Sequence, residues 1–354
     1  MSKRIYSTFF GNLWLVACCM SLLSSCNDSE KYVDDSLVTL KVVLPGDDLQ
    51  EIQSDETRAG ISEPGIEAES KINTLIFMIY NASNVVEIEK SVEIKSDWTS
   101  DDPMWDKNGK SLRIPVTQGS KQIYCIANWS LTGTTEMPLI NKTTAPNPAT
   151  LTGFIRNHAN ITPDNPPVMT ASISTNITAG MQEMPVELKR QVARIELWPN
   201  ISKELSVLGA NVQITGIKFK SLATQAYLFP KSPVASPSGN GQWNQSDYFD
   251  IASSALGETA SEFATKYYIP EYVPTGETTA TEMIIRALYN DNVTYYRLKI
   301  NPAVDASHTI PYAIERNHTY RYYLTILGKG SDSEVTRSIS DQADISLAYK
   351  LEIR

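Results

Sequence analysis

The clearest chemistry in this 354-residue sequence belongs to Cys26, which ends an apolar N-terminal stretch. The preceding residues Leu23-Ser24-Ser25 place an apolar side chain three positions before the cysteine and small side chains between. Small residues give a lipoprotein signal peptidase access to the bond before the cysteine, and its thiol accepts the diacylglyceryl group. The stretch is shorter than the roughly 20 apolar residues that a bilayer requires. We therefore expect residues 1–25 to be a lipoprotein signal peptide and Cys26 to be lipidated; the alternative is an ordinary signal peptide with a chance cysteine.

The remaining cysteines point to a chain without internal disulfides. Of the four cysteines, Cys18 and Cys19 lie in the signal peptide and Cys26 is the lipid attachment site, so that only Cys125 is left. Cys125 lies in the apolar run 123–127, and this context predicts a buried, inert thiol.

No residue pattern in the sequence indicates catalysis or metal binding. None of the three histidines, His158, His308 and His318, has a second ligand-type residue at a helical or hairpin spacing. Zinc-protease, nucleophile-elbow, phosphate-loop and dinucleotide motifs are absent. We expect no catalytic residue, metal or cofactor, and we expect no nucleic-acid partner, because the net charge is −9 and no basic run follows Arg4.

Three tryptophans, Trp98, Trp105 and Trp129, leave a binding function open. Trp98 and Trp105 flank a polar segment typical of an exposed loop. Aromatic rings on such a loop would suit a surface glycan-binding β-sandwich lipoprotein, although tryptophans in sandwiches more often pack in the core or at its rim.

Apolar and polar residues alternate with period two along much of the chain, which predicts an all-β fold of many short strands. The continuous run 75–80 predicts a central strand covered on both faces. A hairpin is expected at Asn290-Asp291-Asn292, and a short helix at 151–157. Two alternating runs matter most: Val38, Leu40, Val42 and Leu44 near the N-terminus, and Ile345, Leu347, Tyr349, Leu351 and Ile353 at the C-terminus.

Several motifs, taken in order, resemble the Bacteroidetes fimbrillin family, the FimA-type subunits of type V pili. The most specific is Glu187-Leu188-Lys189-Arg190-Gln191-Val192-Ala193-Arg194-Ile195. Family members usually have Asn where this sequence has Tyr272, a small departure. The other matching segments are 71–81, 123–128, 167–170, 267–271 and 314–320.

The resemblance implies two transthyretin-like β-sandwich domains in tandem, which we place at 59–182 and 183–354 after a propeptide at 26–58. It also implies that an Arg-specific protease cuts after a loop arginine, here Arg58, so that Ala59 becomes the first residue. The cut would release strand 38–44 and open a groove for a strand of another fimbrial subunit. The precursor would be attached to the outer membrane by its lipid, and the processed subunit would belong to a fimbrium on the cell surface that supports adhesion.

The terminal strand 345–353 is our hypothesis for the donor, because its five apolar residues have the spacing of the released strand. Three alternatives remain open: the strand completes its own domain's sheet, Arg58 is an ordinary loop arginine, or strand 38–44 stays in place as in anchor subunits. The candidate site at Arg58 favours a stalk subunit over an anchor. The lack of an obvious additional adhesive domain favours stalk over tip.

Overall fold

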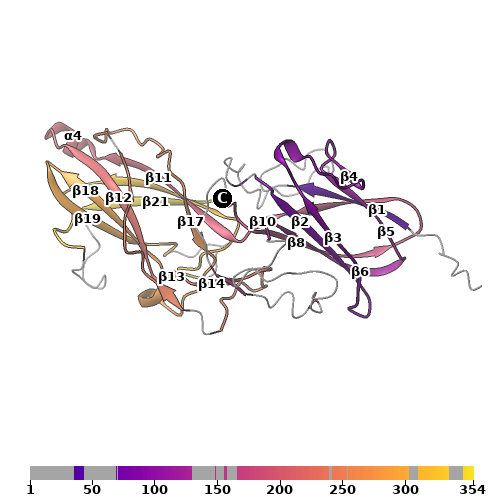
Figure 1. Cartoon of the computed structure of the whole chain (residues 1–354). Coiled ribbons are helices and arrows are strands. Elements are labelled where there is room, and N and C mark those ends of the chain that lie inside the picture. Colours follow the sequence, from indigo (N-terminus) through magenta and orange to yellow (C-terminus); the bar gives the residue numbers. More distant parts are fainter. Residues whose placement is uncertain are drawn as a thin grey trace, which may run out of the picture.

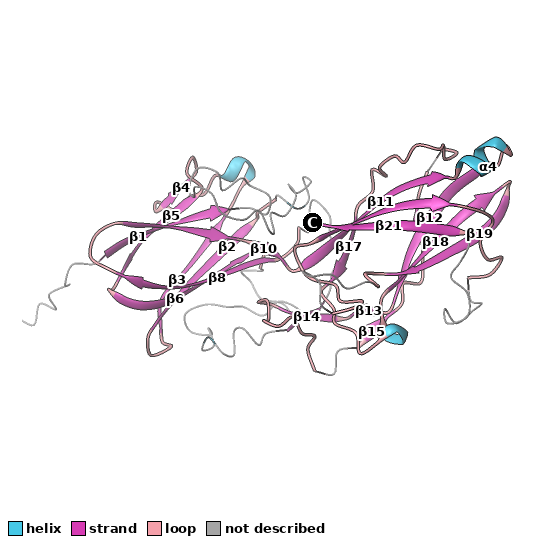
Figure 2. Ribbon diagram, turned by 180° about the vertical axis from the view of Figure 1, so that it is seen from behind, coloured by secondary structure: helices cyan, strands magenta, loops and turns pink. Residues whose placement is uncertain are grey.

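The computed structural model describes residues 36–43, 69, 71–129, 148, 155–157, 166–238, 241–252, 254–302, 310–334 and 346–354. This part of the chain is almost entirely β-structure, arranged as two sandwich domains that lie end to end (Figure 1). Seen from behind, each domain consists of two facing layers of strands (Figure 2). None of the helices among these residues is long and apolar enough to cross a membrane.

The N-terminal domain has a four-stranded sheet in the order β4-β5-β1-β9 that faces a five-stranded sheet in the order β10-β8-β6-β2-β3. Its strands are β1 (Ser36–Val43), β2 (Thr74–Asn81), β3 (Val86–Glu93), β4 (Trp105–Asp106), β5 (Ser111–Val116), β6 (Gly119–Ala127), β8 (Met169–Ile177), β9 (Gln182–Glu187) and β10 (Lys189–Arg190). The short 3-10 turn η2 (Ser96–Trp98) links β3 to β4.

The C-terminal domain has sheets in the orders β17-β11-β20-β21 and β16-β12-β18-β19. Their strands are β11 (Val192–Ile201), β12 (Val212–Lys220), β16 (Phe249–Asp250), β17 (Tyr267–Pro270), β18 (Glu282–Tyr289), β19 (Asn292–Lys299), β20 (Thr319–Ile326) and β21 (Leu347–Ile353). Helix α4 (Lys203–Val207), the 3-10 turn η3 (Glu277–Thr279) and the short pair β13 (Leu222–Ala223) and β15 (Gln242–Trp243) complete the domain.

The two domains repeat one topology. In each, the first strand lies between an antiparallel and a parallel neighbour: β5-β1-β9 in one domain and β17-β11-β20 in the other. The facing sheets also correspond, since β3-β2-β6-β8 and β16-β12-β18-β19 are antiparallel throughout. Strand β21 is the addition in the C-terminal domain. The tandem β-sandwich architecture expected from the sequence is thus confirmed.

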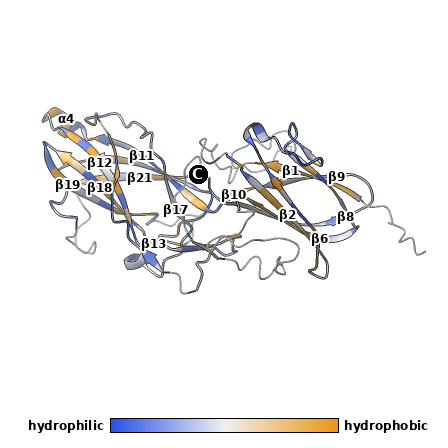
Figure 3. Ribbon diagram, in the orientation of Figure 1, coloured by the Kyte–Doolittle hydropathy of each residue, from blue (hydrophilic) through white to orange (hydrophobic). Residues whose placement is uncertain are grey.

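Alternation builds the two cores as the sequence predicts. Hydrophobic residues concentrate along the strands (Figure 3). Where apolar and polar residues alternate along a strand, the apolar ones face the opposite sheet and form the core. The predicted hairpin joins β18 to β19 through Asn290 and Asp291, whose positive φ angles of 48° and 65° suit the right-handed twist of a two-residue turn.

Strand β2 is buried on both faces, as its continuous apolar run predicts. Leu75, Phe77 and Ile79 face the core of their own sandwich. On the other face, a second apolar cluster around Ile76 is covered by Leu228 and Phe229 from the C-terminal domain. The domains are therefore joined through a third, small layer.

The helix expected at 151–157 is wrong where the structure describes it, because residues 155–157 form strand β7 (Ile155–Asn157). Their backbone pairs with β14 (Gln225–Tyr227) of the other domain. This tertiary pairing outweighs local helical preference.

The boundary between the two domains lies further along the chain than the position 182/183 expected from the sequence. Strand β9 (Gln182–Glu187) spans the expected boundary at 182/183, yet all of it pairs with β1 in the N-terminal sheet. The N-terminal core ends at Leu188, and the C-terminal core begins at Ala193. Because β10 still pairs with β8, we propose a boundary within 190–192, before β11 begins.

Candidate assembly site

Strand β1 lies inside its sheet, although it precedes the rest of the domain in the sequence. It pairs antiparallel with β5 from Ser36↔Val116 to Lys41↔Ser111 and parallel with β9 from Val38↔Gln182 to Val43↔Glu187. At its end, the N–H of Val42 donates to the carbonyl of Lys110 at 2.9 Å, and Val43 accepts from the N–H of Leu188 at 3.0 Å. Both backbone edges of β1 are thus hydrogen-bonded.

The side chains of β1 fill the centre of the N-terminal core. Val38 and Leu40 are 0% exposed and Val42 is 2% exposed. At about 1.5–3 kcal/mol for each, their burial contributes roughly 4.5–9 kcal/mol, as an upper estimate. Leu44, the fourth residue of the predicted strand, lies outside the described residues.

Loss of β1 would leave a groove with two unpaired strand edges. Its sides would carry the apolar residues that now lie beside β1, including Leu112 and Ile114 of β5 and Val186 of β9, and its floor would be the facing sheet of the same core. An apolar trough between two free backbone edges accepts an added strand.

The outer edge of β9 is less suited to a strand. Because Leu188 directs its N–H toward β1, alternation directs residue 185 toward the opposite edge. That residue is Pro185, which has no N–H to donate. Proline at an exposed edge opposes strand addition, so the outer edge of β9 is poorly suited to pair with a further strand.

The processing residues predicted from the sequence, Cys26, Arg58 and Ala59, lie outside the described residues, and their roles stay predictions. The structure describes the two flanks of the predicted cleavage region. Strand β1 ends at Val43, and the chain is next described at Glu69.

The candidate donor, β21, occupies the edge of the C-terminal sheet. It pairs antiparallel with β20 from Tyr320↔Ile353 to Ile326↔Leu347, and within the described part of the chain it has no second neighbour. The strand therefore does complete its own domain's sheet, as one alternative held. It is nevertheless held more weakly than β1, because Tyr349 is 41% exposed and Leu347, Leu351 and Ile353 are only half-buried. Ile345 lies outside the described residues.

The tryptophans do not form an aromatic platform. Trp129 and Trp105 are buried, at 1% and 8% exposure. The half-buried Trp98 stacks on Trp105 with a centroid distance of 6.3 Å, and the Lys110 ammonium lies 4.8 Å from its ring centroid. These rings pack against one another at the rim of the core.

The Cys125 thiol and the His318 imidazole have structural surroundings. Cys125 is buried, as predicted, and its burial raises the pKa of its thiol. The Nδ1 atom of His318 lies 2.9 Å from the carbonyl oxygen of Arg316; His158 and His308 lie outside the described residues. The residues that the structure describes contain no group of three or more His, Cys, Asp or Glu side chains placed to hold a metal.

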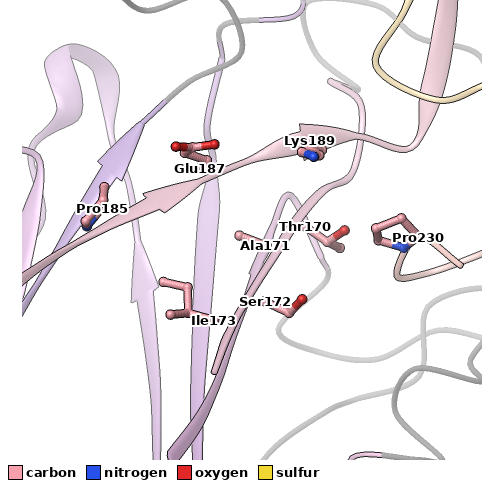
Figure 4. A pocket seen from close by; sticks show the side chains of 8 residues that line it. All are labelled: Thr170, Ala171, Ser172, Ile173, Pro185, Glu187, Lys189 and Pro230. Carbon is pink, nitrogen blue, oxygen red and sulfur yellow. The ribbon is translucent and has the colours of Figure 1, made fainter. Parts of the chain in front are cut away.

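A shallow pocket of about 280 Å³ lies between the edges of β8 and β9 (Figure 4). Its lining comes mainly from Thr170 to Ile173 on one side and from Pro185, Glu187 and Lys189 on the other. The pocket is separated from β1 by β9, so it is not part of the groove that loss of β1 would leave. It marks the seam between the two sheets.

A buried ionic cluster at the domain junction is the feature that the sequence analysis missed. Glu69 accepts hydrogen bonds from the guanidinium groups of both Arg190 and Arg194, the latter at 2.8 Å. All three side chains are at most 3% exposed. Asn317 accepts a further bond from Nε of Arg190 at 3.2 Å. Glu69 thereby fixes the chain that follows the predicted cleavage region to the linker between the domains.

A second buried pair holds the small layer between the domains. Arg316 binds Glu271 through two nitrogens, at 2.7 and 3.0 Å. The same guanidinium donates to the carbonyls of Tyr227 and Leu228. Both clusters use charged residues of the motifs 187–195, 267–271 and 314–320, so those motifs meet at one junction.

Comparison with known proteins agrees with this architecture. Residues 38–191 match the family model of the major fimbrial subunit protein (FimA). No curated protein sequence is significantly similar to the chain.

Three solved structures illustrate the likeness in fold. A candidate cell adhesion protein from Parabacteroides distasonis superposes with a TM-score of 0.60 at 14% identity, over 90% of this chain and 96% of that chain. The tip fimbrial protein Mfa3 from Porphyromonas gingivalis gives 0.56 at 13% identity, over 90% and 99%. A fimbrilin (FimA) from Porphyromonas gingivalis W83 gives 0.54 at 15% identity, over 90% and 97%. Residues 38–191 therefore match the FimA fimbrial subunit family that the sequence motifs resemble, and the chain as a whole has the fold of these fimbrial and cell adhesion proteins.

Proposed function

We propose that this chain is a structural subunit of a surface fimbrium that polymerises by strand exchange and thereby supports cell adhesion. The observation that carries the proposal is the position of β1. It is an interior strand with buried side chains, yet it lies ahead of Arg58 and of the rest of its domain in the sequence. One cut in the following segment would separate it from the rest of the chain.

The proposed route begins with export as a lipoprotein. Cys26 would carry the lipid and attach the precursor to the outer membrane. An Arg-specific protease would then cut between Arg58 and Ala59. The partners of the chain are thus this protease and other fimbrial subunits, either identical or different.

Exchange would place the β21 strand of one subunit in the groove that β1 leaves in another. The energetic argument is a difference in burial. Strand β21 has one neighbour among the described residues and a half-exposed apolar face, whereas the groove offers two backbone edges and a full core position. Moving β21 into the groove would bury more apolar surface and form more backbone hydrogen bonds than its own edge provides.

A stalk role fits best. Every described strand belongs to one of the two sandwiches or to the small ladders beside them, so none is left to form an additional adhesive domain. The candidate cut at Arg58 favours a released subunit over an anchor. We propose no enzymatic activity, and because two of the three tryptophans are buried, no observation favours the glycan-binding alternative.

Truncation after Gln342 tests the donor assignment, because it removes β21 and leaves every other described element in place. We expect the truncated, processed subunit to fold but not to polymerise. A peptide of residues 343–354, with a scrambled peptide as control, should bind processed subunits and stop fibre growth. Normal polymerisation of the truncated subunit would eliminate β21 as the donor.

A further inference from the structure

The segment Gly328–Glu334 follows β20 and precedes the part of the chain that leads to β21. It packs against β19 in the facing sheet of the C-terminal domain. Tyr295 of β19 and Ser331 exchange two backbone hydrogen bonds, both 2.9 Å long. The Tyr296 hydroxyl donates to the carbonyl of Gly328 at 2.8 Å. The segment thus leaves the sheet of β20 and pairs with β19.

The segment lies so close to the backbone of β19 that position 330 must be glycine. A Cβ atom at position 330 would lie 2.4 Å from the carbonyl oxygen of Tyr295. Backbone cannot move aside as a flexible side chain can, so only Gly330 permits this approach.

Glu334 fixes the end of the segment. Its carboxylate accepts from the Lys218 ammonium at 2.8 Å and from the Tyr248 hydroxyl at 3.1 Å, and the Lys220 ammonium lies 3.1 Å away. Its backbone carbonyl accepts from Arg297 at 3.2 Å. Although partial burial acts to raise the pKa of Glu334, these partners lower it to about 2, so the carboxylate is ionised at neutral pH.

We infer that the releasable donor arm begins after Glu334, and that Gly328–Glu334 remains on its own domain when β21 leaves. This inference rests on the proposed role of β21 as donor. Gly328–Glu334 is held by backbone hydrogen bonds to β19, by the close approach of Gly330 and by the ion pairs of Glu334. Strand β21, by contrast, is a half-buried strand at the edge of its sheet. The eleven residues 335–345 span at most about 36–40 Å, which limits how far from Glu334 an acceptor groove can lie.

Two engineered disulfides test whether the donor arm begins after Glu334. The pair Tyr295→Cys/Ser331→Cys ties the segment to β19, and the pair Thr325→Cys/Ala348→Cys ties β21 to β20. Each joins two directly opposed antiparallel residues, whose Cα atoms lie about 5.5 Å apart when hydrogen-bonded, within reach of a disulfide. Residues 27–354 retain every described residue and only the buried Cys125 as a native thiol.

Each variant is cleaved with the Arg-specific protease, and fibre growth is followed by electron microscopy and light scattering with and without reductant. We expect the 295–331 disulfide to leave the growth rate unchanged and the 325–348 disulfide to lower it at least tenfold until it is reduced. If both disulfides block growth, β21 is the donor but the arm starts upstream of Glu334, and the inference is overturned. If the 325–348 disulfide does not block growth, the donor assignment itself fails and the inference fails with it.

A measurement without substitutions gives the same test. In fibres of the unmodified chain, the Tyr295 and Ser331 amides should exchange with deuterium as slowly as in the free subunit. Fast exchange at both amides in the fibre alone would show that the segment had left β19.

Discussion

Substitution of Leu40 by alanine should destabilise the precursor and leave the assembled fibre unaffected. Leu40 is fully buried in the N-terminal core. Leucine-to-alanine changes at such sites cost about 2–5 kcal/mol, a large fraction of the roughly 5–15 kcal/mol that stabilises a domain. If β1 is absent from the fibre, the same substitution has nothing to destabilise there.

The matched control is Leu112→Ala. Leu112 lies directly opposite Leu40 on β5, is equally buried, and stays in the chain after processing. Urea unfolding of the N-terminal domain, followed by tryptophan fluorescence, measures both states. With a slope of about 2 kcal/mol/M, Leu40→Ala should lower the midpoint of the precursor by roughly 1–2.5 M.

In sheared fibres, Leu112→Ala should lower the unfolding midpoint and Leu40→Ala should not. Equal loss of stability in fibres for the two variants would mean that Leu40 is still present in the core. The strand-exchange reasoning would then be refuted.

Three further predictions concern the described residues. Glu69→Gln removes the buried carboxylate that Arg190 and Arg194 share, and Arg194 keeps its pair with Glu196. The substitution should cost about 3–5 kcal/mol in urea unfolding, whereas Asp101→Asn, at an exposed pair with Lys95, should cost at most about 1 kcal/mol. Similar losses for the two variants would contradict the assigned role of the cluster. Because burial raises its thiol pKa, Cys125 should resist iodoacetamide at pH 8 in the folded chain and react after unfolding, and labelling of folded protein would contradict its placement. The pKa of Glu334 is depressed, so its contribution should be complete above its unfolded value of 4.5 and should be lost as the pH falls toward 2. The difference in melting temperature from Glu334→Gln should shrink over that range, and a difference independent of pH would refute the ion pairing.

The sequence predicts the strands well, because alternation is a local signal of a half-buried strand. The run Val38-Thr39-Leu40-Lys41-Val42 indicates β1, and the continuous run 75–80 indicates a strand covered on both faces. Local signals do not show which strands are neighbours. The interior place of β1 therefore follows from its pairing with β5 and β9, which lie about 70 and 140 residues further along the chain.

The junction could not be predicted for a similar reason. Glu69, Arg190 and Arg316 appear in the sequence as ordinary charged residues in polar surroundings. Their burial results from contacts between distant segments: Glu69 and Arg190 are 121 residues apart, Arg316 and Leu228 are 88 apart, and Arg316 and Glu271 are 45 apart. Strand β7 shows the same limitation, since the residues that determine its conformation belong to the other domain.

The central claim is that β1 leaves the chain before assembly, and the intact mass of protein sheared from the cell surface tests it most directly. The account predicts an unacylated species that begins at Ala59 and ends at Arg354, without residues 36–43. A species still acylated at Cys26 would retain β1 in its sheet and would contradict the proposed exchange.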